Sequence, residues 1–326
     1  MSSLTGYIFD AVHALAGIDP LWVALALVLH VTNLACRSVT WRNVLAGAYP
    51  TTRLSTWRVG LAYAVGCALN GYLPARGGEA VKVALVRVQH PETSAVTVAS
   101  SSSVVLIFDS LVGISIMIAA WLMGALPAPP ALPSFVSTLV GSPFLLGMVV
   151  TAVGAGIWYL QRRAAGPVRR AWAQVTQGVA VLRAPGRYAR TVLSMQALAW
   201  CCRIGVVFAL LHAFGIAASF PLAALVVVVG GLSTLVPVPG GAGTQQALAV
   251  FVLAGVTATS TALSFSIGMQ VGITLVNSSI GVAAAMLVFG RMHPGAALRA
   301  AINARHHHHA HPVVFGPVVR PADYVA

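Results

Sequence analysis

The chain has 326 residues, of which 58% are hydrophobic and only 8% are charged, and its mean hydropathy is +0.86. An ordinary soluble domain is excluded, because several stretches exceed the roughly 18 apolar residues that mark a membrane span. The net charge is +13, but the arginines fall mainly between apolar stretches, where they set topology and contact anionic headgroups, so we expect no nucleic-acid partner.

The N-terminal region predicts an interfacial helix followed by the first membrane span. Residues 1–19 contain apolar and acidic side chains but no Arg or Lys, and no cationic segment indicates a cleaved signal peptide. The first span runs from about residue 21 to residue 39. By the positive-inside rule the loop after it is cytoplasmic and the N-terminus is outside, because four arginines follow: Arg37, Arg42, Arg53 and Arg58.

The next apolar segment, residues 59–89, is broken in its middle. Pro74 ends one short helix, Gly77 and Gly78 allow a sharp turn, and a new helix begins near Glu79. Broken backbone is tolerated at membrane depth only where protein or water lines it. The segment therefore predicts a re-entrant hairpin that enters and leaves on the cytoplasmic side.

Two spans and a basic segment follow the hairpin. A span over about 95–124 contains Asp109, and after a proline-rich, uncharged loop a span over about 143–160 returns the chain inward. Residues 161–190 carry seven arginines and no acid. They include a short amphipathic piece near 168–182 that should lie along the cytoplasmic surface.

The second half begins with a span over 191–214 in which Arg203 is embedded. Residues 221–258 hold a second broken motif with uncharged flanks, which predicts a hairpin that opens on the outer face. A last span over about 262–289 brings the C-terminus to the cytoplasm, and residues 291–326 are expected to form a disordered tail.

The second broken motif repeats the first at an offset of 163 residues (232 minus 69). The six aligned pairs are Leu69 with Leu232, Pro74 with Pro237, Gly77 with Gly240, Gly78 with Gly241, Ala84 with Ala247, and Leu85 with Leu248. Three full spans separate the hairpins, and an odd number of crossings turns the second upside down relative to the first. Inverted repeats with broken helices are typical of transporters, whose binding site lies at such segments.

The predicted fold is therefore an all-α polytopic membrane protein with two inverted repeats, about five full spans and two hairpins. Residues 1–290 would form one transmembrane domain, with a first repeat over about 20–124 and a second over about 191–290. The linking span and basic segment, 143–190, would join them.

The first motif has the chemistry of an anion site. The free N–H groups at the start of the second short helix, with Arg76 and Lys82 nearby, suit a lipid phosphate, and Arg76 is the first candidate for that contact. Glu79 could pair with Arg76 or Lys82, or bind a cationic headgroup or a proton. The substrate-binding candidates of both motifs are Asn70, Arg76, Gly77, Gly78, Glu79, Lys82, Gly240, Gly241, Gly243, Thr244 and Gln245.

A simpler interpretation is that the first motif is a cytoplasmic loop whose cations obey the positive-inside rule. The uncharged copy in the other half argues against it, because topology signals need no duplication. Placing the charges of Asp109 and Arg203 in hydrocarbon costs free energy, so the two residues could form an ion pair inside the bundle. With Glu79 they are candidates for charge or proton coupling, while a purely structural pair or interfacial snorkelling is the alternative.

The chemistry of the remaining residues is limited. A run of four histidines, His306 to His309, has no acidic or cysteine partner, so we expect no metal site and no cofactor. No nucleophile elbow, P-loop or paired-carboxylate signature is present.

The two motifs together resemble the lysylphosphatidylglycerol synthase transmembrane-domain family, the flippase-like membrane half of the bacterial multiple peptide resistance factor. The resemblance rests on two patterns, Asn70-x-x-Leu73-Pro74-x-Arg76-x-Gly78-Glu79-Ala80 and Pro237-x-Pro239-Gly240-Gly241-x-Gly243-x-Gln245. It implies translocation of aminoacylated phospholipids or polyprenyl-linked glycolipids across the bacterial inner membrane. The family's soluble synthase domain is absent, so the chain is expected to be a transporter and not an enzyme. Gln245 stands where many relatives have Glu, which weakens cation recognition in the second half.

Two other functions stay open at this point. An accessory subunit for a membrane glycosyltransferase or lipid synthase would dock its enzyme on the basic segment 161–190. An intramembrane enzyme acting on lipid would have only Glu79 and Asp109 as acid or base. The expected partners are membrane lipids, anionic or phosphate-bearing, together with a homo-oligomer or a lipid-modifying enzyme.

Overall fold

A computed structural model describes residues 18–73, 76–124, 147–148, 151, 166–233, 238 and 241–290. These residues are almost entirely helical and contain no strand, which confirms the all-α prediction. The predicted interfacial helix, nearly all of the span over 143–160 and the C-terminal tail lie outside the described residues.

Among the described residues, four helices are long and apolar enough to cross a membrane. Their positions agree with four of the five predicted spans, and they are α2 (Pro20–Ala48), α5 (Ala95–Leu122), the continuous helix Pro185–Ala213, and α13 (Thr259–Phe289). The third consists of α9 (Pro185–Tyr188), a π-helical turn η3 (Ala189–Leu193) and α10 (Ser194–Ala213).

The predicted end of the first span near residue 39 is wrong, since α2 continues to Ala48. Two of the four arginines that suggested a loop, Arg37 and Arg42, lie within this helix, where each has a partner. Arg37 forms an ion pair with Asp109, and Arg42 donates from Nε and one terminal nitrogen to the carbonyl of Leu54 at 3.1 Å each.

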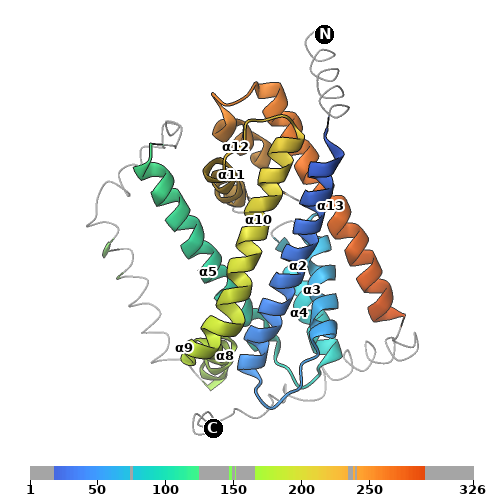
Figure 1. Cartoon of the computed structure of the whole chain (residues 1–326). Coiled ribbons are helices and arrows are strands. Elements are labelled where there is room, and N and C mark those ends of the chain that lie inside the picture. The colour runs from blue at the N-terminus through green and yellow to red at the C-terminus, as the bar shows by residue number, and fades with distance from the viewer. Residues whose placement is uncertain are drawn as a thin grey trace.

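Each broken motif connects two short helices, as predicted. In the first half these are α3 (Thr56–Asn70) and α4 (Gly78–Gln89); in the second they are α11 (Phe220–Leu232) and α12 (Thr244–Leu253). Ser55 and Ser219 cap α3 and α11, because their side chains accept from the backbone N–H groups three residues on. The pairs lie at opposite ends of the α2–α10 pair (Figure 1), an arrangement that fits an inverted repeat, although the repeat relation itself stays a prediction.

The centre of the bundle is the pair α2 and α10, which lie side by side over their lengths (Figure 1). Small residues allow this approach: Ala26 of α2 is buried against Val206 and Ala209 of α10. Two larger apolar clusters flank the pair, one around each hairpin, and α13 contributes to both. Its Phe265 packs with α11 and α12, and its Ala284 packs with α3 and α4.

The outer surfaces of the long helices are apolar. On α5 and α13, large side chains such as Leu111, Ile114 and Leu275 are more than half exposed. A face of this kind is stable against lipid tails and not against water. The chain is therefore a multi-pass membrane protein.

The amphipathic segment predicted near 168–182 is helical, as α8 (Gly166–Gly178) followed by a 3-10 turn, η2 (Ala180–Arg183). It is fixed to the ends of two spans. Gln174 accepts from Ser94 Oγ at 2.8 Å beside α5, and Gln177 donates to the carbonyl of Ala48 at 3.0 Å.

The contact between α3 and α4 yields a stability prediction. A Cβ at Gly78 would lie 2.0 Å from the Gly66 carbonyl oxygen, a backbone atom that cannot rotate away. We expect Gly78→Ala to lower the free energy of unfolding by about 1–3 kcal/mol, because the two helices must separate. Thermal unfolding in detergent measures this. Gly272→Ala, on α13 with nothing within 4 Å, should melt at or slightly above the wild-type temperature. Equal melting of both variants would mean that the helices are not tightly packed.

Candidate functional site

A cavity of about 530 Å³ lies among α2, α3, α4, α5, α10 and α13. Its wall includes polar groups from every one of these helices, in a chain where charge is scarce. Four cations line it, namely Arg37, Arg76, Lys82 and Arg203, together with the carboxylates of Glu79 and Asp109. The cavity wall therefore has an excess of two positive charges.

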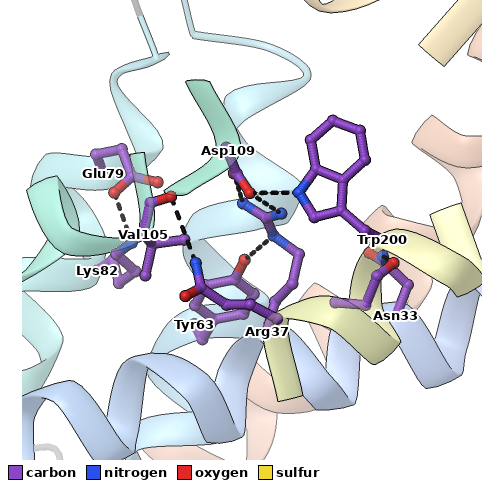
Figure 2. A network of polar contacts seen from close by, with 10 residues as sticks. Asn33, Arg37, Tyr63, Glu79, Lys82, Val105, Asp109 and Trp200 are labelled. Atoms are coloured by element: carbon purple, nitrogen blue, oxygen red, sulfur yellow. Dashed lines mark hydrogen bonds and ion pairs between the residues drawn. The ribbon is translucent and has the colours of Figure 1, made fainter. Parts of the chain in front are cut away.

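One side of the cavity is organised by Arg37 (Figure 2). A terminal nitrogen of its guanidinium lies 2.8 Å from Asp109 Oδ2, and its Nε donates to Tyr63 Oη at 3.1 Å. Trp200 Nε1 donates to the other carboxylate oxygen of Asp109 at 2.8 Å. Three helices and the first hairpin are thus joined by one network, since Arg37 is on α2, Tyr63 on α3, Asp109 on α5 and Trp200 on α10.

The other side is organised by Lys82, the only lysine of the chain. Its side chain is 5% exposed, and its Nζ lies 2.5 Å from Glu79 Oε2. The same Nζ lies 4.3 Å from the ring centroid of Trp41 and 5.1 Å from that of Tyr63, both within cation–π range. Trp41 is held in place because its Nε1 donates to Ser101 Oγ at 2.9 Å. The ammonium group therefore has a carboxylate and two aromatic faces around it.

The remaining two cations are differently placed. Arg203 forms no ion pair with the described residues, and its guanidinium carbon lies 5.4 Å from the centroid of the Trp200 ring. Arg76 is exposed and forms no ion pair within the described part of the chain either. Its φ of 57° is in the left-handed region, which is strained for a side chain of this size.

Two neutral polar atoms in the cavity wall also lack partners. Ser102 Oγ on α5 and Asn70 Oδ1 at the end of α3 are buried and have no hydrogen-bond partner among the described residues. A buried polar group without a partner is costly, so a ligand that supplies one gains affinity.

The first motif turns by a mechanism different from the predicted one. Gly77 and Gly78 were expected to provide the sharp turn, but Gly77 has an ordinary helical φ of −56°, and the described residue with positive φ in this motif is Arg76. Gly78 is instead required by space, because it packs against the backbone of Gly66. Its role is close helix contact and not conformational freedom.

The second motif does use glycine for its backbone, with φ of 69° at Gly241 and 80° at Gly243. It then closes on itself. Gln246 Oε1 accepts from the backbone N–H of Gly243 at 2.7 Å, and Thr244 Oγ1 donates to the Gly241 carbonyl at 2.9 Å. Gly240 lies outside the described residues, and the other candidates of this motif do not line the cavity: Gly241, Gly243, Thr244 and Gln245.

The structure brings six predicted site residues to one cavity: Asn70, Arg76, Glu79, Lys82, Asp109 and Arg203. Of the pairings considered for Glu79, the one with Lys82 is formed. The pair suggested between Asp109 and Arg203 is wrong, since Asp109 pairs with Arg37 and Trp200. Arg37 is the partner because α5 packs against α2, a neighbourhood that spacing along the chain cannot reveal.

Sequence reasoning missed Arg37, which it treated as a topology signal, and the aromatic residues of the cavity. A signal was present on α2, where His30, Asn33, Arg37 and Trp41 recur every three or four residues and so share one face. The structure uses this whole stripe: Asn33 Nδ2 donates to the carbonyl of Ala199 at 2.5 Å, and His30 Nε2 lies 2.9 Å from Asn277 Oδ1.

Within the described residues, no three His, Cys, Asp or Glu side chains gather as a metal site would require. A family model described as the lysylphosphatidylglycerol synthase TM region matches residues 8–301, which is most of the chain. No curated protein matches the sequence.

The Arg37–Asp109 ion pair can be tested by a double-mutant cycle. Each side chain is about one-fifth exposed (20% and 18%), so the loss of either partner leaves a charge in a poorly solvated place. We expect Arg37→Gln and Asp109→Asn each to lower the free energy of unfolding by about 2–4 kcal/mol. The double variant should lose about 1–3 kcal/mol less than the sum, measured by denaturant titration in mixed micelles.

Arg58→Gln serves as the control, because Arg58 is exposed at the start of α3 and should change stability by less than about 0.5 kcal/mol. Strict additivity of the two cavity substitutions would show that the pair does not stabilise the bundle.

Proposed function

We propose that this chain, which belongs to the lysylphosphatidylglycerol synthase TM region family, translocates a lipid between leaflets. The family points to a membrane protein of lysylphosphatidylglycerol-related lipid handling. The lipid carries a phosphate, either as a phospholipid or as a lipid-linked precursor, and the membrane is the bacterial inner membrane. The protein acts as a flippase-like transporter and not as an enzyme.

The cavity of about 530 Å³, with its excess of two positive charges, is the observation that carries this proposal. Ionisable groups among spanning helices are expensive and mark substrate pathways. Six of them around one space, surrounded by helices with apolar outer faces, suit a ligand with a charged head and apolar tails.

In this proposal each group has a defined role. Arg76, at the break between α3 and α4, and Arg203, on α10, bind the phosphate, because neither is neutralised by a carboxylate of the described residues. Glu79 and Asp109 hold Lys82 and Arg37 in place. With these two ion pairs in place, Arg76 and Arg203 are the cations of the cavity wall that are available to a phosphate.

The proposed orientation places the N-terminus outside and the C-terminus in the cytoplasm. The exposed arginines of the described residues gather where α2 ends, where α4 ends and along η2 and α9, for example Arg53, Arg87 and Arg183. This is the lower end in Figure 1, and the positive-inside rule assigns such an end to the cytoplasm.

Translocation can be measured with a fluorescent phospholipid in proteoliposomes, by the fraction that a membrane-impermeant quencher reaches over time. We expect Arg76→Gln and Glu79→Gln to slow translocation by about tenfold or more, because each removes a charged contact in the cavity. Arg87→Gln is the matched control: Arg87 lies on α4 with Glu79 but is exposed and outside the cavity wall, so its rate should equal the wild type.

Equal rates for all three variants would place the site elsewhere. A different outcome would support the accessory-subunit function. In that case the wild type moves no lipid but copurifies with a lipid-modifying enzyme, and a variant with Arg183→Gln and Arg187→Gln no longer copurifies with that enzyme.

A further inference from the structure

The cavity contains two carboxylates and two aromatic faces that could receive a cationic headgroup, and protein cations already occupy them. Glu79 is bound by Lys82 at 2.5 Å, and Asp109 is bound by Arg37 at 2.8 Å. The rings of Trp41 and Tyr63 both face Lys82 Nζ, at 4.3 and 5.1 Å. Every feature that recognises an ammonium group is therefore satisfied from within the chain.

The groups that remain available have the opposite preference. Arg203 and Arg76 are cations without a carboxylate among the described residues, and both face the cavity. Ser102 Oγ and Asn70 Oδ1 are buried polar atoms in the same wall with no described partner. Two guanidinium groups suit a phosphate, the serine hydroxyl can donate to it, and the amide oxygen can accept from a headgroup hydroxyl.

We infer that this cavity selects an anionic, hydroxyl-bearing phosphate headgroup without an ammonium group, and that Lys82 is the residue that enforces the choice. The inference rests on the proposed function and names its substrate class. Lys82 acts as a tethered ammonium: it fills the place between Glu79, Trp41 and Tyr63 that a headgroup amine would otherwise take.

The charge of the site gives the physical reason. An added ammonium group would meet four cations and no free carboxylate, in surroundings where water screens poorly. Like charges brought together at an interface repel, so rejection of the wrong headgroup arises from repulsion as much as from missing contacts. Phosphatidylglycerol carries one negative charge and two hydroxyls. Lysylphosphatidylglycerol carries two ammonium groups on the same scaffold and is the sharpest comparison.

The test is an equimolar competition with matched acyl chains. The purified full chain is incubated with phosphatidylglycerol, lysylphosphatidylglycerol and phosphatidylethanolamine, and the bound lipids are counted by native mass spectrometry. We expect wild type to retain phosphatidylglycerol over either amine-bearing lipid by about tenfold or more. Arg76→Gln should lose most of the bound phosphatidylglycerol.

The decisive variant is Lys82→Met, which keeps the apolar stem and removes the ammonium. It frees Glu79 and the two rings, so retention of the amine-bearing lipids should rise and the preference should fall to about threefold or less. A selective gain of the amine-bearing lipids, with phosphatidylglycerol still retained, distinguishes loss of the ammonium group from misfolding. Lys82→Gln is the second variant, and Arg87→Met, exposed on the same helix, should keep the wild-type preference.

The outcomes separate the two proposals. A wild type that prefers lysylphosphatidylglycerol or phosphatidylethanolamine overturns the inference and leaves translocation of a phosphate-bearing lipid intact. An unchanged preference in both Lys82 variants also overturns it. Bulk lipid retained equally by wild type and Arg76→Gln would contradict the proposed function itself.

Discussion

A charge among membrane-spanning helices is stable only when another part of the protein compensates it, and in this chain the compensation joins the bundle together. Arg37 on α2 binds Asp109 on α5 and Tyr63 on α3, and Asp109 also binds Trp200 on α10. No single helix could satisfy these groups alone. The network that makes the cavity polar is thus the network that sets the relative positions of its walls, so binding chemistry and tertiary structure depend on the same contacts.

The two broken segments share a pattern but differ in what they do. The first places its charged residues in the cavity and is held against the rest of the hairpin by the backbone contact at Gly78. The second satisfies its own polar groups through Gln246 and Thr244. Two segments with a similar sequence pattern therefore form a charged cavity wall in one case and a neutral turn in the other, within the described structure.

The fold was largely predictable because its signals are local. Long apolar runs give spans, and proline with glycine breaks the two hairpins, so four spans and both hairpins were located, although α2 continues well past its predicted end to Ala48. Pairing was not predictable, because it depends on which helices are neighbours. Arg37 was interpreted as a loop residue, and only the fold brings it next to Asp109. The role of Gly78, at the start of α4, depends on its contact with Gly66 on the neighbouring helix α3. In the site itself the Glu79–Lys82 pair was among the pairings considered, whereas the Arg37–Asp109 pair and the aromatic residues of the cavity were not anticipated.

The presence of one lysine in the whole chain has a practical consequence. Apart from the α-amino group, Lys82 offers the sole target for an amine-directed reagent, and it is enclosed by two aromatic rings and a carboxylate. Its rate of chemical labelling therefore reports how often water and small molecules enter the enclosure. The protein carries a built-in probe of its own opening, readable without an added fluorophore or an engineered cysteine.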